Sequence, residues 1–245
     1  SGTIVITGST SVEKILTEMK DEFCAMYPNV TIEYTGSGSS AGIKDTKAGT
    51  NNIGASSREL KEEEKEDALK TEVFAYDGIA VIVNPANEAA SDITVEQLCD
   101  IYSGKITNWS EVGGNDAEIV LIGREAGSGT RDGFEAITKT EDSCKYRQEL
   151  TSTGDVVQTV ASNPNAIGYA SVASVKDTVK LISVEGVTPS TETIQNGSYK
   201  IQRNFVMVTK KNAELSPAAK SFFEFATSSA ADEWIIEAGA VPVKR

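Results

Sequence analysis

A polar loop at residues 123–135, with the sequence GREAGSGTRDGFE, combines the residue types that bind small anions. An arginine presents a planar fork of N–H donors that fits the oxygens of an oxyanion. Serine and threonine hydroxyls can donate further hydrogen bonds, and glycine lets a ligand approach the backbone closely. The loop buries few apolar side chains, so folding alone does not explain it, and we predict that it binds an anion. The residues that would do so are Arg124, Ser128, Gly129 and Thr130.

Two earlier loops have the same character, GSTS at 8–11 and GSGSS at 36–40, and SSREL at 56–60 is a weaker further case. Each follows a strand-like segment and precedes a helix-like one. The first amides of a helix lack backbone partners, and they carry roughly half a positive charge that attracts anions. Taken singly, each loop is explained as an ordinary helix N-cap. Together with an arginine, they favour one anion site at the carboxyl edge of a parallel sheet.

The alternation of strand-like and helix-like segments predicts an α/β fold. Thr94 and Gln97 form a capping box that opens one short helix. Two long strand-like stretches, 73–83 and 199–209, suit a chain that crosses into a second lobe and returns. We expect one lobe of residues 1–77 plus 205–245 and a second of 78–204. The other expected strands are 3–7, 30–34, 53–55, 118–122, 163–171 and 177–184, and the expected helices are 12–23, 61–67, 155–161, 216–226 and 232–239.

The composition excludes several classes of function. The chain has 245 residues and a formal net charge of −13, which makes it a poor general binder of nucleic acid. It contains no histidine, which removes the commonest general base, the commonest metal ligand and the Ser–His–Asp triad. The spacing of Cys24, Cys99 and Cys144 matches no zinc site, and we expect Cys24 and Cys99 to be core thiols. No apolar run approaches the roughly 20 residues that cross a bilayer.

Three enzyme or nucleotide motifs are only partly matched. GSSAG at 38–42 fits the nucleophile elbow around Ser40, but no histidine is present to activate that serine. The loop at 123–131 lacks the GK[ST] of a Walker A motif, and GSGSSAG places its last glycine one position late for a dinucleotide fingerprint. We therefore expect a binding protein without enzymatic activity, without a cofactor and without a metal.

The order of these loops resembles the phosphate-binding subunits of bacterial phosphate-specific ABC importers over nearly the whole chain. The motifs that carry the resemblance are ITGSTSV, YTGSGSSAGI, IGASSREL, YDGIAVIVNP, IYSGKITNW, GREAGSGTR and NAIGYAS. The resemblance implies a two-lobe periplasmic-binding-protein fold of type II, with two crossover strands and the ligand in the cleft between the lobes. Hinge motion is then expected near 76–79 and 203–206.

The resemblance also implies a set of phosphate-binding residues. Thr10, Ser39 and Arg124 match the family's threonine, serine and arginine, and Ser128, Gly129 and Thr130 match its third loop. Ser57 either binds directly or only caps a helix. The full candidate set is Ser9, Thr10, Ser11, Ser39, Ser40, Ser57, Asp77, Arg124, Ser128, Gly129 and Thr130.

Two positions depart from the family pattern and leave the acceptor of the ligand's proton open. Ser57 stands where some members have an aspartate, and Ala126 stands where they have an acid two residues after the arginine. Asp77 is our candidate acceptor, and the alternative is that it only shapes a turn with Gly78. Arg131 either reaches the ligand or pairs with a surface acid such as Asp132; we favour the surface role.

The implied function is the capture of inorganic phosphate and its delivery to the permease subunits of an ABC importer. We expect a monomer outside the cytoplasmic membrane, in a periplasm or lipid-anchored at the cell surface, with signal and anchor segments absent from this chain. The alternatives are a receptor for sulfate, molybdate or tungstate, a phosphatase or phosphoryl-transfer enzyme, and an adhesin or signalling protein that has lost its ligand.

Overall fold

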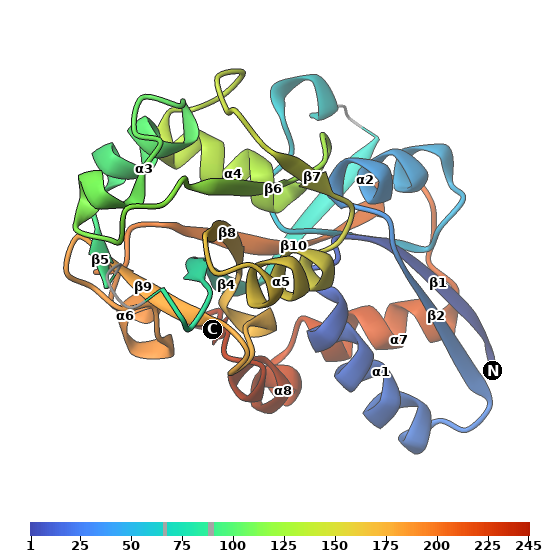
Figure 1. Cartoon of the computed structure of the whole chain (residues 1–245). Coiled ribbons are helices and arrows are strands. Elements are labelled where there is room, and N and C mark those ends of the chain that lie inside the picture. The colour runs from blue at the N-terminus through green and yellow to red at the C-terminus, as the bar shows by residue number, and fades with distance from the viewer. Residues whose placement is uncertain (66–67, 88–90) are drawn as a thin grey trace. The chain divides into compact units, whose positions relative to one another are not determined.

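The computed structural model describes residues 1–65, 68–87 and 91–245 (Figure 1). Strands and helices alternate along most of the chain, so the predicted α/β class is confirmed. The strands are β1 Gly2–Gly8, β2 Val30–Gly36, β3 Ile53–Ser56, β4 Leu69–Val83, β5 Asp92–Ile93, β6 Val120–Arg124, β7 Gln148–Leu150, β8 Ala166–Ser171, β9 Lys180–Val184, β10 Gln202–Lys210 and β11 Val241–Pro242. The α-helices are α1 Glu13–Met26, α2 Ser39–Ala48, α3 Val95–Tyr102, α4 Gly129–Thr138, α5 Thr153–Ser162, α6 Thr191–Gln195, α7 Pro217–Ala226 and α8 Asp232–Glu237.

The chain divides into two units. The first contains Ser1–Asp77, Gly127–Gly129 and Arg203–Arg245, and the second contains Gly78–Ala126 and Thr130–Gln202. The chain therefore passes from one unit to the other inside β4 and β10, and again around the loop before α4. Whether these units are the moving lobes that the sequence suggests stays a prediction.

The sheet of the first unit has the strand order β2-β1-β3-β10-β4, and β11 pairs with β4. β1 runs parallel to both β2 and β3, so the carboxyl ends of these three strands share one edge. β10 is antiparallel to β3. From Ile4 onward, fully buried and half-buried residues alternate along β1, and Ile4 and Ile6 are fully buried. The shared edge is where the three polar loops of this unit begin.

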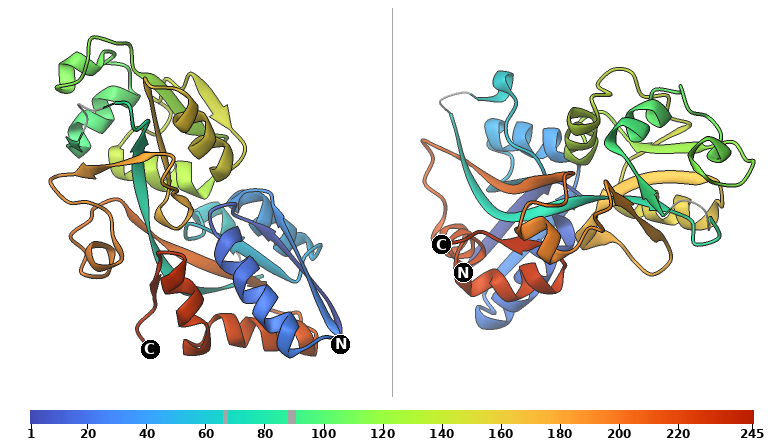
Figure 2. Two further views of the ribbon diagram at one scale, coloured as in Figure 1. Left: turned by 60° about the horizontal axis from the view of Figure 1, so that its bottom comes forward. Right: turned by 90° about the vertical axis from the view of Figure 1, so that its left-hand side faces the viewer.

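Helices cover both faces of this sheet. α1, α7 and α8 lie together (Figure 2), joined by an aromatic cluster in which the rings of Phe23 and Phe222 lie 5.3 Å apart. The buried stripe of α1 is Ile15, Leu16, Met19 and Phe23, which recur at helical spacing. Gly42 of α2 packs so tightly on β1 that an added Cβ would lie 2.5 Å from the carbonyl oxygen of Thr7. This close approach fixes the start of α2 beside the end of β1.

In the second unit the strand order is β4-β8-β6-β7, and β9 pairs with both β4 and β5. Successive side chains of a strand point to opposite faces. At Gly168 of β8 an added Cβ would meet Val156 and Val160 of α5. The next residue, Tyr169, stacks on Phe134 of α4 with ring centroids 4.2 Å apart. α5 and α4 therefore cover opposite faces of β8, as Figure 1 shows.

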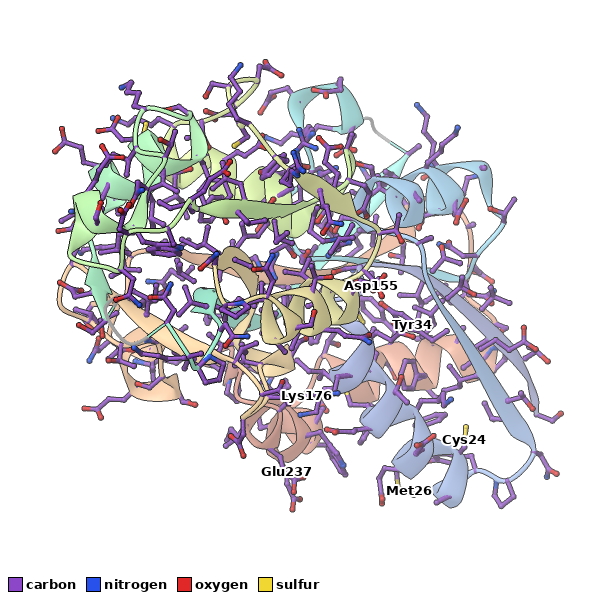
Figure 3. All side chains as sticks on the ribbon, viewed as in Figure 1. Cys24, Met26, Tyr34, Asp155, Lys176 and Glu237 are labelled. Atoms are coloured by element: carbon purple, nitrogen blue, oxygen red, sulfur yellow. The ribbon has the colours of Figure 1, made fainter. Side chains whose placement is uncertain are left out.

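Several details differ from the sequence-based expectations. In place of a helix over 61–67 there is a short 3₁₀ helix at Glu62–Glu64, and residues 66 and 67 lie outside the described part of the chain. Cys24 and Cys99 are partly exposed, so the prediction that they are core thiols is wrong. Cys24 directly follows Phe23 on α1 and therefore lies beside the buried face of the helix, not on it. Figure 3 shows Cys24 near Met26, which is 48% exposed. The capping box of Thr94 and Gln97 is confirmed.

Within the described residues, no helix is both long enough and apolar enough to cross a membrane.

Candidate functional site

In the first unit, the loops that follow β1, β2 and β3 are tied together at one backbone position, Gly8. The carbonyl oxygen of Gly8 accepts hydrogen bonds from the amides of Ser37 and Gly38, both 2.8 Å long. Across β3, an added Cβ at Gly8 would lie 2.0 Å from the carbonyl oxygen of Ala55, so only glycine fits there. The amide of Ser9 then donates to Ala55 at 2.9 Å. GSTS, GSGSS and the weaker case SSREL thus gather at the carboxyl edge of the parallel strands, whereas the meeting of these loops with the Arg124 loop stays a prediction.

The start of α2 and the end of β3 are joined through two buried serines. Ser39 Oγ accepts a hydrogen bond from the amide of Ser57 at 3.0 Å and lies 3.2 Å from Ser57 Oγ. Both side chains are at most 1% exposed. Gly129, at the start of α4, belongs to the same unit, and an added Cβ there would lie 2.4 Å from Ser39 Oγ and 2.5 Å from Ser57 Oγ. Two hydroxyls and the backbone of Gly129 therefore meet at one point, and hydroxyls beside the residue that opens a helix are suited to binding a small anion.

Ser40 is occupied by other contacts. Its hydroxyl accepts a hydrogen bond from Arg58 Nη2 at 2.8 Å, and its amide donates to the carbonyl of Gly127 at 3.1 Å. Arg58 is itself held by Glu64, through Nη1 at 2.7 Å and Nη2 at 2.9 Å. Ser40 therefore acts as a link between loops in this unit, and its role as a ligand stays a prediction.

The Arg58–Glu64 pair makes stability depend on pH. Burial acts to raise the pKa of Glu64, but the hydrogen bonds from Arg58 and from the Lys61 amide together hold this pKa below its ordinary value of 4.5. A depressed folded-state pKa contributes stability that is fully present above the ordinary value and is lost as pH falls through the folded-state value. We expect Glu64→Gln to lower the free energy of unfolding by about 1 kcal/mol near neutral pH. Urea midpoints from about pH 6 to about pH 3 should show the two proteins converging at the acid end.

Glu63→Gln is the matched control for this variant, because Glu63 is an exposed neighbour in the same 3₁₀ helix. Its urea midpoint should follow that of the unmodified protein at each pH. A Glu64→Gln deficit of constant size across the whole range would contradict the assignment of the pKa effect to the pair with Arg58.

The loop after β1 is fixed by Tyr34, a residue of β2 that the sequence analysis did not single out. The Tyr34 hydroxyl donates to the carbonyl oxygen of Ser9 at 2.6 Å. Burial, helped by the nearby Glu13 carboxylate, raises the pKa of Tyr34 well above its ordinary value, so the hydroxyl keeps its proton. Ser9 Oγ in turn accepts from the Ser11 amide at 3.2 Å. Ser9 and Ser11 are buried and Thr10 between them is partly exposed, so this loop offers Thr10 for contact with a ligand.

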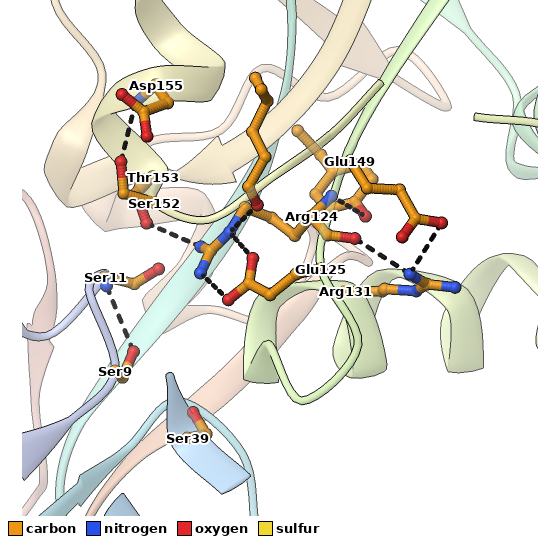
Figure 4. A network of polar contacts seen from close by, with 12 residues as sticks. Ser9, Ser11, Ser39, Arg124, Glu125, Arg131, Glu149, Ser152, Thr153 and Asp155 are labelled. Atoms are coloured by element: carbon orange, nitrogen blue, oxygen red, sulfur yellow. Dashed lines mark hydrogen bonds and ion pairs between the residues drawn. The ribbon is translucent and has the colours of Figure 1, made fainter. Parts of the chain in front are cut away.

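In the second unit, Arg124 lies at the end of β6 and is 2% exposed (Figure 4). The Glu125 carboxylate accepts two hydrogen bonds from this guanidinium, from Nε to Oε2 at 2.8 Å and from Nη2 to Oε1 at 2.9 Å. Nη1 donates to Thr153 Oγ1 at 3.1 Å, at the first residue of α5. A guanidinium has five N–H groups, so these contacts leave N–H groups on Nη1 and Nη2 for an anion.

Glu125 and Thr153 are thus functional candidates that sequence reasoning missed. The family pattern directed attention to the position two residues after the arginine, where this chain has Ala126. The acid that pairs with the arginine is instead its immediate neighbour. Arg124 and Glu125 are adjacent in the sequence, but neighbouring side chains of an extended strand point to opposite faces and are not expected to meet. It meets here because the chain turns at the end of β6.

Arg131 pairs with acidic side chains, as suggested, and these acids are Glu135 and Glu149. Its Nε donates to Glu135 Oε1 at 2.8 Å, and its Nη1 lies 3.3 Å from Glu149 Oε1 and 3.0 Å from the carbonyl oxygen of Arg124. On a helix, residues i and i+4 share a face while i and i+1 do not, which explains the choice of Glu135. The expected ion pair exists, with different partners.

Asp77 is fully buried in the first unit and forms an ion pair with Arg203 of β10. Both Nε and Nη2 of Arg203 lie 3.0 Å from Asp77 Oδ2. The guanidinium also lies 5.4 Å from the ring centroid of Phe205. The pair therefore cross-links β4 and β10 beside the two places where these strands leave the unit. Asp77 as the acceptor of a ligand proton stays a prediction.

Comparison with known proteins agrees with this fold. Residues 1–230 match the family model described as a PBP superfamily domain. Over 98% of its length the chain is 34% identical to the phosphate-binding protein PstS of Borreliella burgdorferi, of which it covers 90%. It is 31% identical to PstS of Bacillus subtilis, with 99% of this chain and 81% of that protein covered.

Solved structures give the same result. The crystal structure of a putative phosphate ABC transporter substrate-binding protein with bound phosphate from Clostridium perfringens has a TM-score of 0.95 at 42% identity, covering 99% of this chain and all of the other. An ABC-type phosphate transport receptor from Vibrio cholerae has a TM-score of 0.80 at 35% identity, covering 98% and 100%. The chain therefore belongs to the PBP superfamily and, within it, to the family of the PstS proteins.

Proposed function

We propose that this chain captures inorganic phosphate and delivers it to the permease subunits of an ABC importer. The observation that carries the proposal is the meeting of Ser39 Oγ, Ser57 Oγ and the backbone of Gly129 at one point of the first unit. Relatives named for phosphate binding support the identity of the anion. In this proposal the protein acts as a monomeric binding protein outside the cytoplasmic membrane, and it catalyses no reaction.

The proposed ligand contacts are hydroxyls, amides and one guanidinium. Thr10, Ser39 and Ser57 donate hydroxyls, together with the amides that follow Gly127. Arg124 supplies the positive charge, with its guanidinium oriented by Glu125. Local N–H dipoles and a single guanidinium suffice to hold an anion in a protein whose net charge is −13. The complete proposed set remains the eleven residues named from the sequence, joined now by Glu125 and Thr153 as supporting groups.

In this proposal, phosphate is distinguished from sulfate by the number of protons that each anion carries. Phosphate near neutral pH carries one or two protons and needs an acceptor, whereas sulfate carries none. Asp77 is the acceptor that the sequence nominated, and Glu125 is a second carboxylate that accompanies the proposed anion-binding arginine. A carboxylate beside the ligand would bond a protonated oxyanion and repel an unprotonated one. Sites that match hydrogen bonds in this way can discriminate by a factor on the order of 10⁴ or more.

The decisive experiment is calorimetric titration of the purified chain, first stripped of anions by partial unfolding and dialysis. Phosphate is expected to bind at one site, and about a thousandfold excess of sulfate should leave its apparent affinity unchanged. Molybdate and tungstate are tested in the same way. Preference for any of these three over phosphate would identify a receptor for another oxyanion, and absence of binding to all four would indicate a protein that has lost its ligand. Release of phosphate from p-nitrophenyl phosphate, with or without added divalent metal, would establish an enzyme instead.

A further inference from the structure

The backbone of Arg124 is held by side chains at the place where the sheet ends. β6 pairs with β8 only at Val120 and Leu121, so the residues after Leu121 have no strand partner on that side. Buried amide groups need hydrogen-bond partners wherever the ladder stops. The Arg124 amide donates to the hydroxyl of Tyr169 at 3.2 Å, and its carbonyl oxygen accepts from Arg131 Nη1 at 3.0 Å. Both polar backbone groups of the proposed anion-binding residue are thus fixed by side chains of the same unit.

These two side chains are connected to each other. The Tyr169 and Tyr146 hydroxyls lie 2.8 Å apart, and Tyr146 donates to Glu135 Oε1 at 2.8 Å. Tyr146 has one proton, which goes to the carboxylate, so Tyr169 must be the donor between the two hydroxyls. Glu135 Oε1 also accepts from Arg131 Nε at 2.8 Å. The bonds form a closed ring that starts at the Arg124 amide, runs through Tyr169, Tyr146, Glu135 and Arg131, and ends at the Arg124 carbonyl.

Packing immobilises the members of this ring. Tyr169 stacks on Phe134 at 4.2 Å with only 15° between the ring planes. The Arg131 guanidinium lies 4.9 Å from the centroid of the Tyr146 ring. At Gly123, an added Cβ would lie 2.2 Å from Tyr146 Cε1. Tyr146 can therefore join the hydrogen-bond ring only because the residue before Arg124 has no side chain. Burial raises the pKa of both tyrosine hydroxyls, so each keeps the proton that the ring requires.

We propose that Tyr169, Tyr146, Glu135 and Arg131 are positioning residues that aim the Arg124 guanidinium at the phosphate without contacting the phosphate themselves. The inference rests on the proposed function for its ligand, while the ring itself is formed by the chain's own groups. A backbone locked at both polar groups leaves the arginine side chain fewer orientations, so less freedom is lost when an anion binds. The same geometry explains why a glycine precedes the arginine in GREAGSGTR.

The test compares three tyrosine-to-phenylalanine variants, each of which removes one hydroxyl and keeps the aromatic side chain. Tyr169→Phe and Tyr146→Phe break the hydrogen-bond ring. Tyr102→Phe is the matched control, since Tyr102 is as buried as Tyr169, lies in the same aromatic cluster and donates to the carbonyl of Ile122 at 3.3 Å, outside the hydrogen-bond ring. By calorimetry we expect the first two to weaken phosphate binding roughly tenfold, by analogy with residues that orient metal ligands, and the control less than about twofold.

Two further measurements separate positioning from general loss of stability. In an Arg124→Lys background, Tyr146→Phe should lose most of its effect on phosphate affinity, because it acts through the arginine. Amide hydrogen exchange at Arg124, measured without ligand, should accelerate about tenfold or more in Tyr169→Phe and also in Tyr146→Phe, but not in Tyr102→Phe.

The outcomes are distinguishable. If the unmodified chain binds no phosphate, the proposed function fails, and the exchange measurement still decides whether the ring holds Arg124. If phosphate binds and both ring variants retain full affinity, the positioning role is overturned while the proposed function stands. An Arg124 amide that exchanges at the same rate in all three variants would overturn the ring itself.

Discussion

Replacing Arg124 by methionine is expected to weaken phosphate binding by about a thousandfold, equivalent to about 4 kcal/mol. The guanidinium is 2% exposed, and its partners leave it N–H groups for a ligand. Removing one partner of a buried, hydrogen-bonded charge pair costs about 2–5 kcal/mol, largely because the remaining charge is left unpaired. Here the loss is increased by Glu125, whose carboxylate would lose its two bonds from Arg124 and would be left without that counter-charge. Calorimetric titration with phosphate measures the effect.

Two controls separate these contributions. The double variant Arg124→Met with Glu125→Gln removes the unpaired carboxylate and should recover part of the affinity, about tenfold. Arg147→Ala removes an exposed arginine from the same unit and should bind as the unmodified chain does. If Arg124→Met bound phosphate with unchanged affinity, another residue would have to supply the positive charge, and the proposed site would be wrong.

Asp77→Leu is expected to lower the free energy of unfolding by about 3–5 kcal/mol. Asp77 is fully buried, and the Arg203 side chain is only 4% exposed. Deleting the carboxylate leaves a guanidinium in the interior without its counter-charge, and burying an unpaired charge is among the most costly changes that a fold can suffer. The shift of the urea midpoint, read by circular dichroism, gives the size of the effect.

The pairing explanation predicts a specific rescue. Asp77→Leu combined with Arg203→Met replaces the pair by apolar side chains of similar size, and buried pairs replaced in this way are often neutral or stabilising. The double variant should therefore unfold near the midpoint of the unmodified chain. A double variant no more stable than Asp77→Leu alone would show that the ion pair is not the source of the effect. Phosphate affinity of Asp77→Asn separately tests whether Asp77 accepts the ligand's proton.

Much of the fold was accessible from local patterns. The strand at 3–7 was recognisable because an apolar run bounded by polar residues favours a strand, and the strand at 30–34 because its apolar and polar residues alternate. α1 was recognisable because its buried residues recur every three or four positions. The capping box of Thr94 and Gln97 involves neighbours in sequence, so its geometry is encoded locally. The short strands β5, β7 and β11 were missed, since two or three residues carry no periodicity of their own.

The sequence by itself determined the α/β class, the polar loops that follow strands and the absence of histidine chemistry, and it led to the prediction that Arg124 binds the anion. These depend on residue type and on spacing along a few neighbouring positions. The tertiary structure decided which groups meet: Asp77 with Arg203, 126 residues apart; Ser39 with Ser57; and Tyr146 with Tyr169 behind Arg124. Such pairs depend on strand order and on which face each side chain occupies. A hydrogen bond tolerates only a few tenths of an ångström, and no local pattern carries that information.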